Sequence, residues 1–429
     1  MNPVTTLVLA YPDDWKMAPL WAVAPRTRDS GQPHLQPLSV FLGEGVVPRA
    51  ERTDNHNRLG IDLGKYLHVR PGNLVFNKLR TWQGGLGVSR HEGIVSPAYF
   101  VCRPTSHVSP QFLHYLLRSK PYLAELTRLS KWMPPSQFDI AWNELRRLPI
   151  LLPPMEEQRR IADFLDDHVQ QLGGTDRVRA QQQALLAERR AALIRVAVVG
   201  VSEAERWRAV ALPWVRFLPQ HWDVAKLTRI ARLGSGHTPS RSRQDWWTDR
   251  TIPWITTGEV AQMREDRVES ITETREKISE LGLANSAAEL HPRGTVVLCR
   301  TASAGYSAVM GVDMATSQDF ATWTCGPRLD PYYLLWTLRA MRPYLLGALA
   351  IGSTHKTIYM PDIEALQVPL PPIKEQRSRI SDLRVRLTAL DQAWDALRRQ
   401  RDLLAERRTA LITAAVTGRI DVTTARGVA

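Results

Sequence analysis

The stretch that decides the fold is Leu185-Leu186-Ala187-Glu188-Arg189-Arg190, which occurs again 218 residues later as Leu403-Leu404-Ala405-Glu406-Arg407-Arg408. The same offset relates Pro153-Pro154 to Pro371-Pro372 and Glu157-Gln158-Arg159 to Glu375-Gln376-Arg377. Self-similarity at a fixed period is the signature of a repeated architecture. The chain is therefore predicted to build one structural unit twice, with a pseudo-two-fold internal repeat.

Each copy ends in a long helical pattern that starts after a Pro-Pro pair and stops at Gly200 or Gly418, as helix-start and C-cap rules predict. Residues in each pattern recur at alternating spacings of four and three, the period of a coiled coil. The second seam runs from Leu383 to Leu411 without Pro or Gly. The first seam, from Leu165 to Leu193, is polar in its middle and contains Gly173-Gly174, where we expect a kink or a local opening.

The segments before the two helices have a different composition, rich in Trp, Gly, Pro and short apolar runs. Runs such as Asn73 to Phe76 and Gly294 to Leu298 are typical of short strands bounded by turns, and helical patterns follow from Pro110 and Pro331. The predicted fold class is α+β. Two globular domains are separated by two long antiparallel helices that form a coiled-coil spacer. The predicted domain boundaries are 1–150 and 206–370 for the globules, and 151–205 and 371–429 for the helical segments.

Composition narrows the classes of function. Lys and Arg total 56 against 43 acidic residues in 429, a formal net charge of +13, which points to a polyanionic partner. The three cysteines are far apart and offer neither a disulfide framework nor a CxxC metal pair. No apolar stretch is long enough to span a membrane and no secretory signal is evident, so we expect a cytoplasmic protein without a membrane partner.

A helix of forty residues is about 60 Å long. Two basic globules on such a spacer suit two sites on one DNA duplex, whose major-groove faces recur every ~34 to 36 Å.

At this level of detail the sequence resembles a known family, the specificity (S) subunits of type I restriction-modification systems. Pro-Pro-x-x-Glu-Gln-Arg at 153–159 and 371–377, followed by a helix with Leu-Leu-x-Glu-Arg-Arg, is similar to the conserved-region repeat of those subunits. The globules resemble two types of target-recognition domain, through segments 70–85 and 93–99 in the first and 236–240, 252–259 and 352–354 in the second.

The resemblance implies a DNA-recognition subunit without an active site of its own. Each target-recognition domain would read one half of a bipartite DNA site, and the helices would recruit two DNA methyltransferase (M) subunits. A motor-nuclease (R) subunit would complete the restriction complex. The candidate partner-binding residues lie in the repeated helix motifs: Glu157, Gln158, Arg159, Glu188, Arg189, Glu375, Gln376, Arg377, Glu406 and Arg407.

The sequence motifs also give no indication of catalytic activity. The nearest approach to the Asn/Asp-Pro-Pro-Tyr/Phe loop of an adenine methyltransferase is Asp330-Pro331-Tyr332-Tyr333, which is better interpreted as the N-cap and first turn of a helix. No phosphate-binding loop and no HExxH pattern occur, and His355 is better interpreted as a loop or phosphate contact than as a metal ligand. We therefore expect no catalytic residue, no cofactor and no metal.

Base readout needs hydrogen-bonding side chains on loops, with Arg suited to guanine and Asn or Gln to adenine. For each candidate the alternative is a solvated loop or a phosphate contact. The candidates are Asn77, Lys78, Arg80, Gln83, Ser136 and Gln137 in the first globule, and Thr238, Ser240, Arg241, Arg243, Arg300, Ser303, Gln318, Thr354 and Lys356 in the second. The tryptophans Trp82, Trp246, Trp247 and Trp254 are expected to support the fold.

Two other classes of protein remain open at this stage. A self-sufficient methyltransferase or nuclease would need a catalytic motif that the sequence does not show. A stand-alone architectural or transcription-type DNA-binding protein is disfavoured by the two unlike globules, because such dimers usually read palindromes with identical halves.

Overall fold

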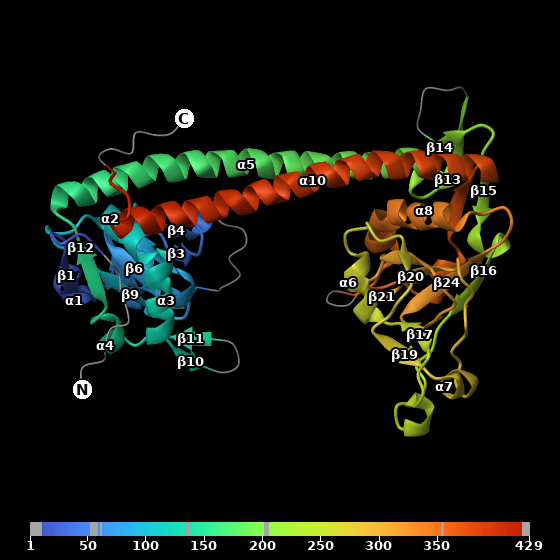
Figure 1. Cartoon of the computed structure of the whole chain (residues 1–429), viewed down its shortest axis with the longest axis horizontal. Coiled ribbons are helices and arrows are strands. Elements are labelled where there is room, and N and C mark those ends of the chain that lie inside the picture. The colour runs from blue at the N-terminus through green and yellow to red at the C-terminus, as the bar shows by residue number, and fades with distance from the viewer. Residues whose placement is uncertain are drawn as a thin grey trace. The chain divides into compact units, whose positions relative to one another are not determined.

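The computed structural model describes residues 11–51, 59–60, 62–133, 137–200, 206–352 and 356–422 (Figure 1). The chain forms two compact units. Unit 1 comprises Met1–Ala180 and Arg398–Ala429, and unit 2 comprises Gln181–Leu397. Each of the two long helices therefore contributes one part to each unit.

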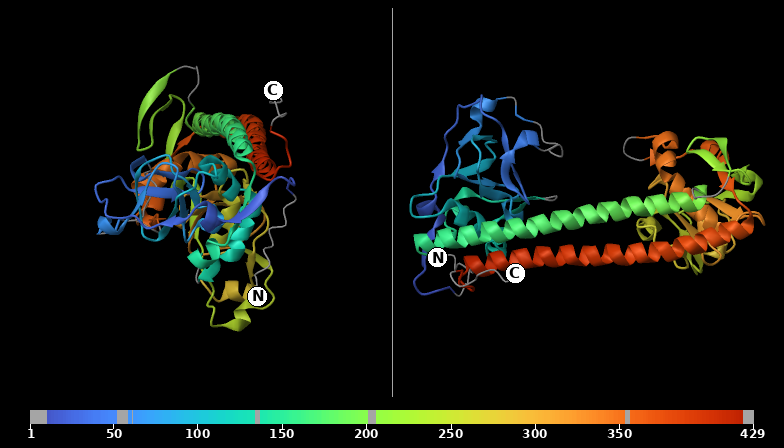
Figure 2. Two further views of the ribbon diagram at one scale, coloured as in Figure 1. Left: turned by 90° about the vertical axis from the view of Figure 1, so that its left-hand side faces the viewer. Right: turned by 90° about the horizontal axis from the view of Figure 1, so that it is seen from above.

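The long helices are α5 (Met155–Val199) and α10 (Ile373–Val416), which run alongside one another in the views of Figure 2. Both begin directly after a Pro-Pro pair. Gly200 and Gly418 follow their ends with φ of 78° and 69°, the left-handed conformation that glycine adopts without strain, so the predicted helix limits are confirmed. The helix α5 is assigned as helix without interruption through Gly173 and Gly174, so the local opening expected there is absent.

The antiparallel direction of the helices is visible within each unit. In unit 1, Ile161 of α5 and Val416 of α10 share one hydrophobic core, and Asp176, further along α5, pairs with Arg401, which comes earlier in α10. Arg401 Nε donates to Asp176 Oδ1 over 2.6 Å. Arg401, a seam residue of α10, thus pairs with Asp176, one of the polar residues in the middle of the α5 seam.

Unit 2 repeats this arrangement at the other ends of the helices. Val198 of α5 and Ile380 of α10 lie in one core, and Arg190 of α5 forms an ion pair with Asp391 of α10. Moving toward the end of α5 therefore again means moving toward the start of α10, as an antiparallel pair requires.

The globular part of unit 1 is built on a four-stranded antiparallel sheet in the order β2-β9-β6-β7, with smaller two-stranded sheets β1-β12, β3-β4, β5-β8 and β10-β11 around it. Its strands are β1 (Lys16–Pro19), β2 (Arg26–Thr27), β3 (Leu38–Phe41), β4 (Gly45–Pro48), β5 (Leu67–Val69), β6 (Leu74–Asn77), β7 (Leu86–Val88), β8 (Gly93–Val95), β9 (Tyr99–Cys102), β10 (Lys131–Met133), β11 (Gln137–Asp139) and β12 (Pro149–Leu152). Its short helices are α1 (Leu20–Val23), η1 (Arg49–Glu51), η2 (Leu63–Lys65), η3 (Thr81–Gln83), α2 (Pro110–Leu117), α3 (Lys120–Leu129) and α4 (Trp142–Leu145).

Unit 2 has a different sheet, five strands in the order β16-β24-β20-β22-β18, beside a three-stranded sheet β19-β17-β23 and the pairs β13-β14, β15-β26 and β21-β25. Its strands are β13 (Trp207–Leu212), β14 (Val215–Pro219), β15 (Asp223–Lys226), β16 (Ala231–Ser235), β17 (Ile252–Ile255), β18 (Ser270–Ile271), β19 (Glu276–Ile278), β20 (Val296–Cys299), β21 (Thr301–Ala302), β22 (Ser307–Met310), β23 (Ala315–Thr316), β24 (Phe320–Cys325), β25 (Lys356–Thr357) and β26 (Gln367–Leu370). Its short helices are η4 (Leu227–Arg229), η5 (Gln244–Trp247), η6 (Thr257–Glu259), α6 (Val260–Met263), α7 (Glu280–Ala284), α8 (Pro331–Tyr344), the π-helical η7 (Leu345–Leu349) and α9 (Met360–Glu364).

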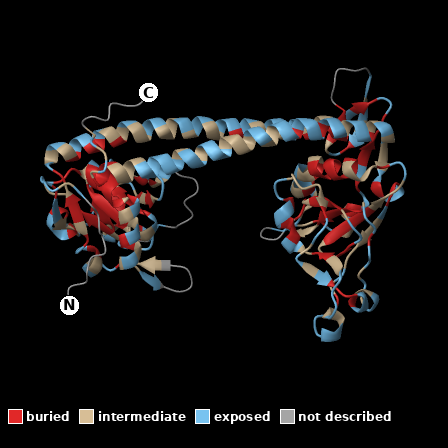
Figure 3. Cartoon of the chain, viewed as in Figure 1, coloured by how far each residue is buried: buried red, intermediate tan, exposed pale blue. Residues whose placement is uncertain are grey.

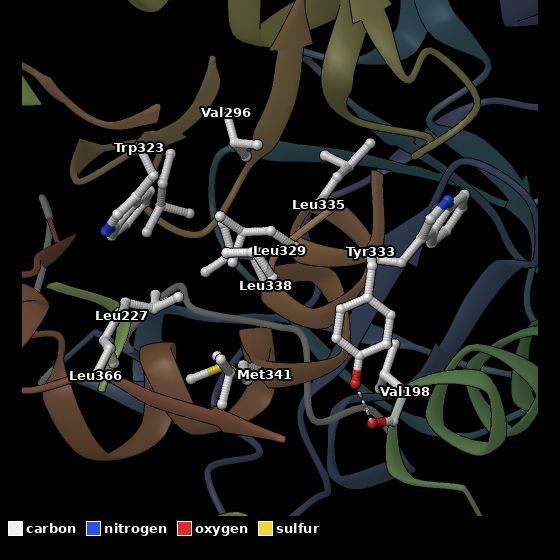
Figure 4. Close-up of a cluster of buried hydrophobic side chains, with 14 of the residues drawn as sticks. Val198, Leu227, Val296, Trp323, Leu329, Tyr333, Leu335, Leu338, Met341 and Leu366 are labelled. Carbon is white, nitrogen blue, oxygen red and sulfur yellow. Dashed lines mark hydrogen bonds between the residues drawn. The ribbon is translucent and has the colours of Figure 1, made fainter. Parts of the chain in front are cut away.

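Burial is concentrated in the globular parts, whereas much of the surface of α5 and α10 is exposed (Figure 3). The largest core of unit 2 gathers residues from α8, the five-stranded sheet and both long helices (Figure 4). Inside it, the Tyr333 hydroxyl of α8 lies 3.1 Å from the carbonyl oxygen of Val198 and 3.2 Å from that of Pro369. This hydroxyl therefore links α8 to the end of α5 and to β26.

Candidate nucleic-acid interface

The loop between β6 and β7 in unit 1 is held rigid by its own backbone. Asn77 N–H donates to the Gly85 carbonyl over 2.9 Å, and the N–H groups of Gly85 and Gln83 both donate to the Arg80 carbonyl, over 2.8 and 3.0 Å. Gly84 has φ of 88°, and a Cβ on Gly85 would lie 2.7 Å from the carbonyl oxygen of Arg80. The Gly-Gly pair in the sequence is therefore required by a tight loop that presents the side chains of Arg80 and Gln83 to solvent.

This loop forms one wall of a cleft of about 540 Å³, which we call the unit 1 cleft. Arg80 and Gln83 are exposed in it, whereas Asn77 is engaged internally, donating to the Tyr99 hydroxyl and accepting from Leu79 N–H. The lining residues are Leu38, Ser39, Arg49, Leu59, Tyr66, Asn77, Leu79, Arg80, Trp82, Gln83, Ser96, Ala98 and Tyr99.

The unit 1 cleft has a positive and aromatic character. Burial raises the pKa of the Tyr99 phenol above its ordinary value, and the positive charges of Arg49 and Arg80 act against that rise, which places both cations near this ring. None of the described residues that line the cleft is acidic. Arg49 was not among the sequence candidates, because it follows β4 far from the loop in sequence, and no local motif marks it.

The other candidates of unit 1 are either partly engaged within the fold or lack a described side chain. Lys78 is 3.8 Å from Asp139 and 5.5 Å from the Phe100 ring, so its ammonium group is partly engaged. Ser136 lies outside the described residues, and Gln137 is described only as the first backbone position of β11. Trp82 packs on Phe138 at 4.7 Å, in agreement with its expected role as a support of the fold.

In unit 2 the structure brings three candidates together. The Thr238 hydroxyl donates to Gln318 Oε1 over 2.7 Å, and Arg300 Nε donates to the Gln318 carbonyl over 3.0 Å. The two loops approach closely because residue 236 is glycine, whose Cβ would lie 1.9 Å from the carbonyl oxygen of Thr316. We call Thr238, Arg300 and Gln318 the unit 2 cluster.

Two further candidates lie in or beside the short β21-β25 ribbon. Ser303 forms an isolated bridge with Lys356, whose Nζ donates to the Leu346 carbonyl over 3.1 Å. Lys356 is exposed, so its charge remains accessible to solvent. Thr354 and His355 lie outside the described residues.

Arg241 and Arg243 lie on an aromatic loop and are engaged in ion pairs. Arg241 pairs with Glu276 at 3.0 Å and its guanidinium lies 4.6 Å from the Trp247 ring centroid. Arg243 pairs with Asp245 at 2.8 Å, and hydrogen bonding to that carboxylate raises its pKa. The Ser240 hydroxyl contacts that of Ser242. A DNA contact by either arginine would have to replace or share an exposed ion pair, which costs little.

The repeated Glu-Gln-Arg motif forms the same joint in both units. Gln158 is 1% exposed; its Oε1 accepts from Ser109 N–H over 2.8 Å and its Nε2 donates to the Pro153 carbonyl over 2.9 Å. Gln376 is 0% exposed and makes the same contacts with Asp330 N–H and the Pro371 carbonyl. These two side chains are therefore committed to the fold and are not accessible to a partner in this structure.

The glutamates of this motif also contact the globules. The Trp15 indole N–H donates to Glu157 over 3.1 Å, and that of Trp222 donates to Glu375 over 3.2 Å. The glycines after the long helices complete the joint, because a Cβ on Gly200 would lie 3.0 Å from the Trp222 ring. The Glu-Gln-Arg motif alone did not indicate these contacts, because each tryptophan is more than 140 residues away from its glutamate in sequence.

The remaining helix candidates are exposed and thus available to a partner: Arg159, Glu188, Arg189, Arg377, Glu406 and Arg407. Leu185 in unit 2 and Leu403 in unit 1, which occupy equivalent positions of the repeat, are both 62% exposed. The same exposed leucine therefore occurs at the same position of the repeat in both copies.

The segment that most resembled a methyltransferase motif is the start of α8. Asp330 Oδ1 accepts from Tyr332 N–H over 3.0 Å and Pro331 occupies the first turn, which confirms the predicted N-cap. Among the described residues, no group of three or more His, Cys, Asp or Glu side chains could hold a metal ion. In the same part of the chain, no helix is long and apolar enough to cross a membrane.

Comparisons with known proteins agree with this architecture. Residues 219–393 match the type I restriction modification DNA specificity domain. The MjaX type I restriction enzyme specificity subunit of Methanocaldococcus jannaschii is 22% identical over 377 residues, 85% of this chain and 81% of that protein. The MjaIX specificity subunit of the same organism is 27% identical over 162 residues, which cover 37% of this chain and only 36% of that relative.

Two solved structures share the fold. A chain from a study of complex assembly and conformational transition of the type I R-M system has a TM-score of 0.72 at 18% identity, covering 96% of this chain and 100% of that one. The HsdS subunit from Thermoanaerobacter tengcongensis has a TM-score of 0.50 at 18% identity, covering 96% and 99%.

The fold and the repeated joint define a duplicated α+β protein in which two unlike globular parts are each attached to a pair of long helices. Residues 219–393 match the family of type I restriction modification DNA specificity domains, and the chain is similar over most of its length to a type I restriction enzyme specificity subunit.

Proposed function

We propose that this chain is the DNA sequence-specificity subunit of a cytoplasmic type I restriction-modification complex and has no catalytic centre of its own. The globular part of each unit reads one half of a bipartite DNA site. The observation that carries this proposal is that one helix-to-globule joint occurs twice, while the two globules differ in their sheets. A common frame with two unlike surfaces suits a protein that reads two different short sequences.

The chemistry of the two surfaces supports DNA as the ligand. The unit 1 cleft offers Arg49, Arg80 and Gln83, and the unit 2 cluster offers Arg300 and Gln318. Arginine and glutamine are the side chains suited to guanine and adenine in the major groove, and arginine also binds phosphate.

The helices support recruitment of two methyltransferase subunits. Leu185, Glu188 and Arg189 are exposed in unit 2, and the equivalent residues of the repeat are exposed in unit 1. Residues three and four positions apart share one helix face, so each copy presents the same stripe. Two equal stripes suit two copies of one partner. A motor-nuclease subunit would then associate with the assembled methyltransferase.

Reconstitution with the cognate methyltransferase subunit tests the function. We expect the chain alone neither to methylate nor to cleave DNA, and the mixture to methylate one bipartite sequence. Exchanging residues 1–150 for the first globule of another family member should change only one half of that sequence. Turnover by the chain alone, or a change in both halves, would contradict the proposal.

Partner stoichiometry tests the role of the helices. Leu185→Asp or Leu403→Asp places a charge in one stripe and should reduce the complex from two methyltransferase subunits to one, and the double variant should bind none. Leu281, 49% exposed on α7, offers Leu281→Asp as the matched control, which should retain both. Native mass spectrometry measures the result. Full assembly by the double variant would exclude these stripes as the contact.

A further inference from the structure

The unit 1 cleft contains a hydrogen-bond donor, the Tyr99 hydroxyl, that has no acceptor among the described residues. The Tyr99 oxygen accepts a hydrogen bond from Asn77 Nδ2 over 3.3 Å. In the part of the chain that the structure describes, no hydrogen bond uses its hydroxyl proton. That proton is available to an acceptor that enters the cleft.

The charges in the cleft point to the same kind of occupant. The guanidinium groups of Arg49 and Arg80 form no ion pair with any described residue, in contrast to Arg241 and Arg243 of unit 2. Both lie close enough to Tyr99 to act on its phenol electrostatically. Two cations and a hydroxyl donor without a carboxylate form a site for an anion with several acceptor oxygens.

The backbone around these groups is prepared for binding. Arg80 belongs to the rigid β6–β7 loop, and Arg49 N–H donates to the Pro37 carbonyl over 2.9 Å at the start of η1. A site whose backbone is fixed before binding loses less conformational freedom when its ligand arrives. Gln83 lies in the same loop and is exposed.

We infer that Arg49, Arg80 and the Tyr99 hydroxyl hold one backbone phosphodiester of the target DNA in the unit 1 cleft, while Gln83 faces a base beside it. This inference rests on the proposed function and deepens it, because it divides the cleft into a positioning site and a reading side chain. Arg49 then sets affinity without changing the sequence that is read.

The test uses the full chain with its methyltransferase subunits, one duplex that carries the methylated site and one unrelated duplex. Arg49→Ala should weaken binding to both duplexes equally, by about tenfold. The slope of log affinity against log salt should become shallower by about 0.9, the value for one lost phosphate contact in B-DNA. Arg49→Lys should keep most of the slope, because an ammonium group also binds phosphate as a point charge.

Two further variants separate the site from general effects. Arg147→Ala removes the same charge from an exposed position outside the cleft and should leave the slope unchanged. Tyr99→Phe should weaken binding severalfold with an unchanged slope, since it removes a neutral donor. Gln83→Ala should alter the methylated sequence.

The outcomes distinguish this inference from the function on which it rests. A wild-type slope for Arg49→Ala, or a change in the methylated sequence caused by it, would overturn the phosphate assignment alone. A wild-type complex that binds neither duplex would overturn the proposed function as well.

Discussion

Replacing Gln376 by Ala should destabilise unit 2 strongly, although the residue belongs to a motif that suggests a partner contact. Its amide accepts from Asp330 N–H over 2.8 Å and donates to the carbonyls of Arg328 and Pro371 over 2.9 and 2.8 Å, with no exposed surface. Three hydrogen bonds at about 1 kcal/mol each give a loss of roughly 3 kcal/mol in the free energy of unfolding. The truncation also leaves the buried Pro371 carbonyl without this partner.

Urea unfolding measures this loss, and hydrogen exchange by mass spectrometry locates it. Exchange should increase where α8 begins and at the start of α10. Gln181, exposed on α5 in the same unit, provides the matched control Gln181→Ala, which should change stability by less than about 0.5 kcal/mol. The equivalent Gln158→Ala should produce a similar loss in unit 1, where Ser109 N–H loses its acceptor. If Gln376→Ala were as stable as Gln181→Ala, the joint would not depend on this amide.

Three further predictions concern an ion pair, a close backbone approach and a base contact. Hydrogen bonding to Arg401 lowers the pKa of Asp176, so the pair stabilises the fold above the ordinary Asp pKa of about 3.9 and ceases to do so as pH falls through the lowered value. Because the two side chains are 40% and 38% exposed, Asp176→Asn should cost under about 1 kcal/mol at pH 7, and this difference should vanish in acid unfolding measurements. Gly236→Ala should cost more than about 2 kcal/mol in thermal unfolding, because its Cβ would meet the Thr316 carbonyl at 1.9 Å, whereas Gly347→Ala, with open space around it, should be tolerated. Arg300→Ala should cost about 1 to 3 kcal/mol in binding and relax one position of one half-site, as mapped by methylation sequencing; a uniform loss with a shallower salt slope would instead identify a phosphate contact.

The candidate reading residues divide according to what surrounds them. Arg80 and Gln83 are as accessible as their loop position suggested, but both polar atoms of the Asn77 side chain are used inside the fold. Asparagine is a good reader of adenine and an equally good support of a turn, and sequence alone does not distinguish the two uses. Which bases these loops contact stays a prediction.

The sequence by itself determined the duplication, the mixed α+β class and the two long helices. These features depend on local hydrogen bonding and on a hydrophobic period that is written directly in the chain, so Pro-Pro and Gly could mark the helix limits to within two residues. The tertiary structure alone decided which side chains are free to act. Gln158 is buried against Ser109, Asp176 pairs with Arg401, and Arg49 of η1 lies near Tyr99 of β9. Each of these contacts joins residues distant in sequence, whose approach depends on the packing of the whole unit.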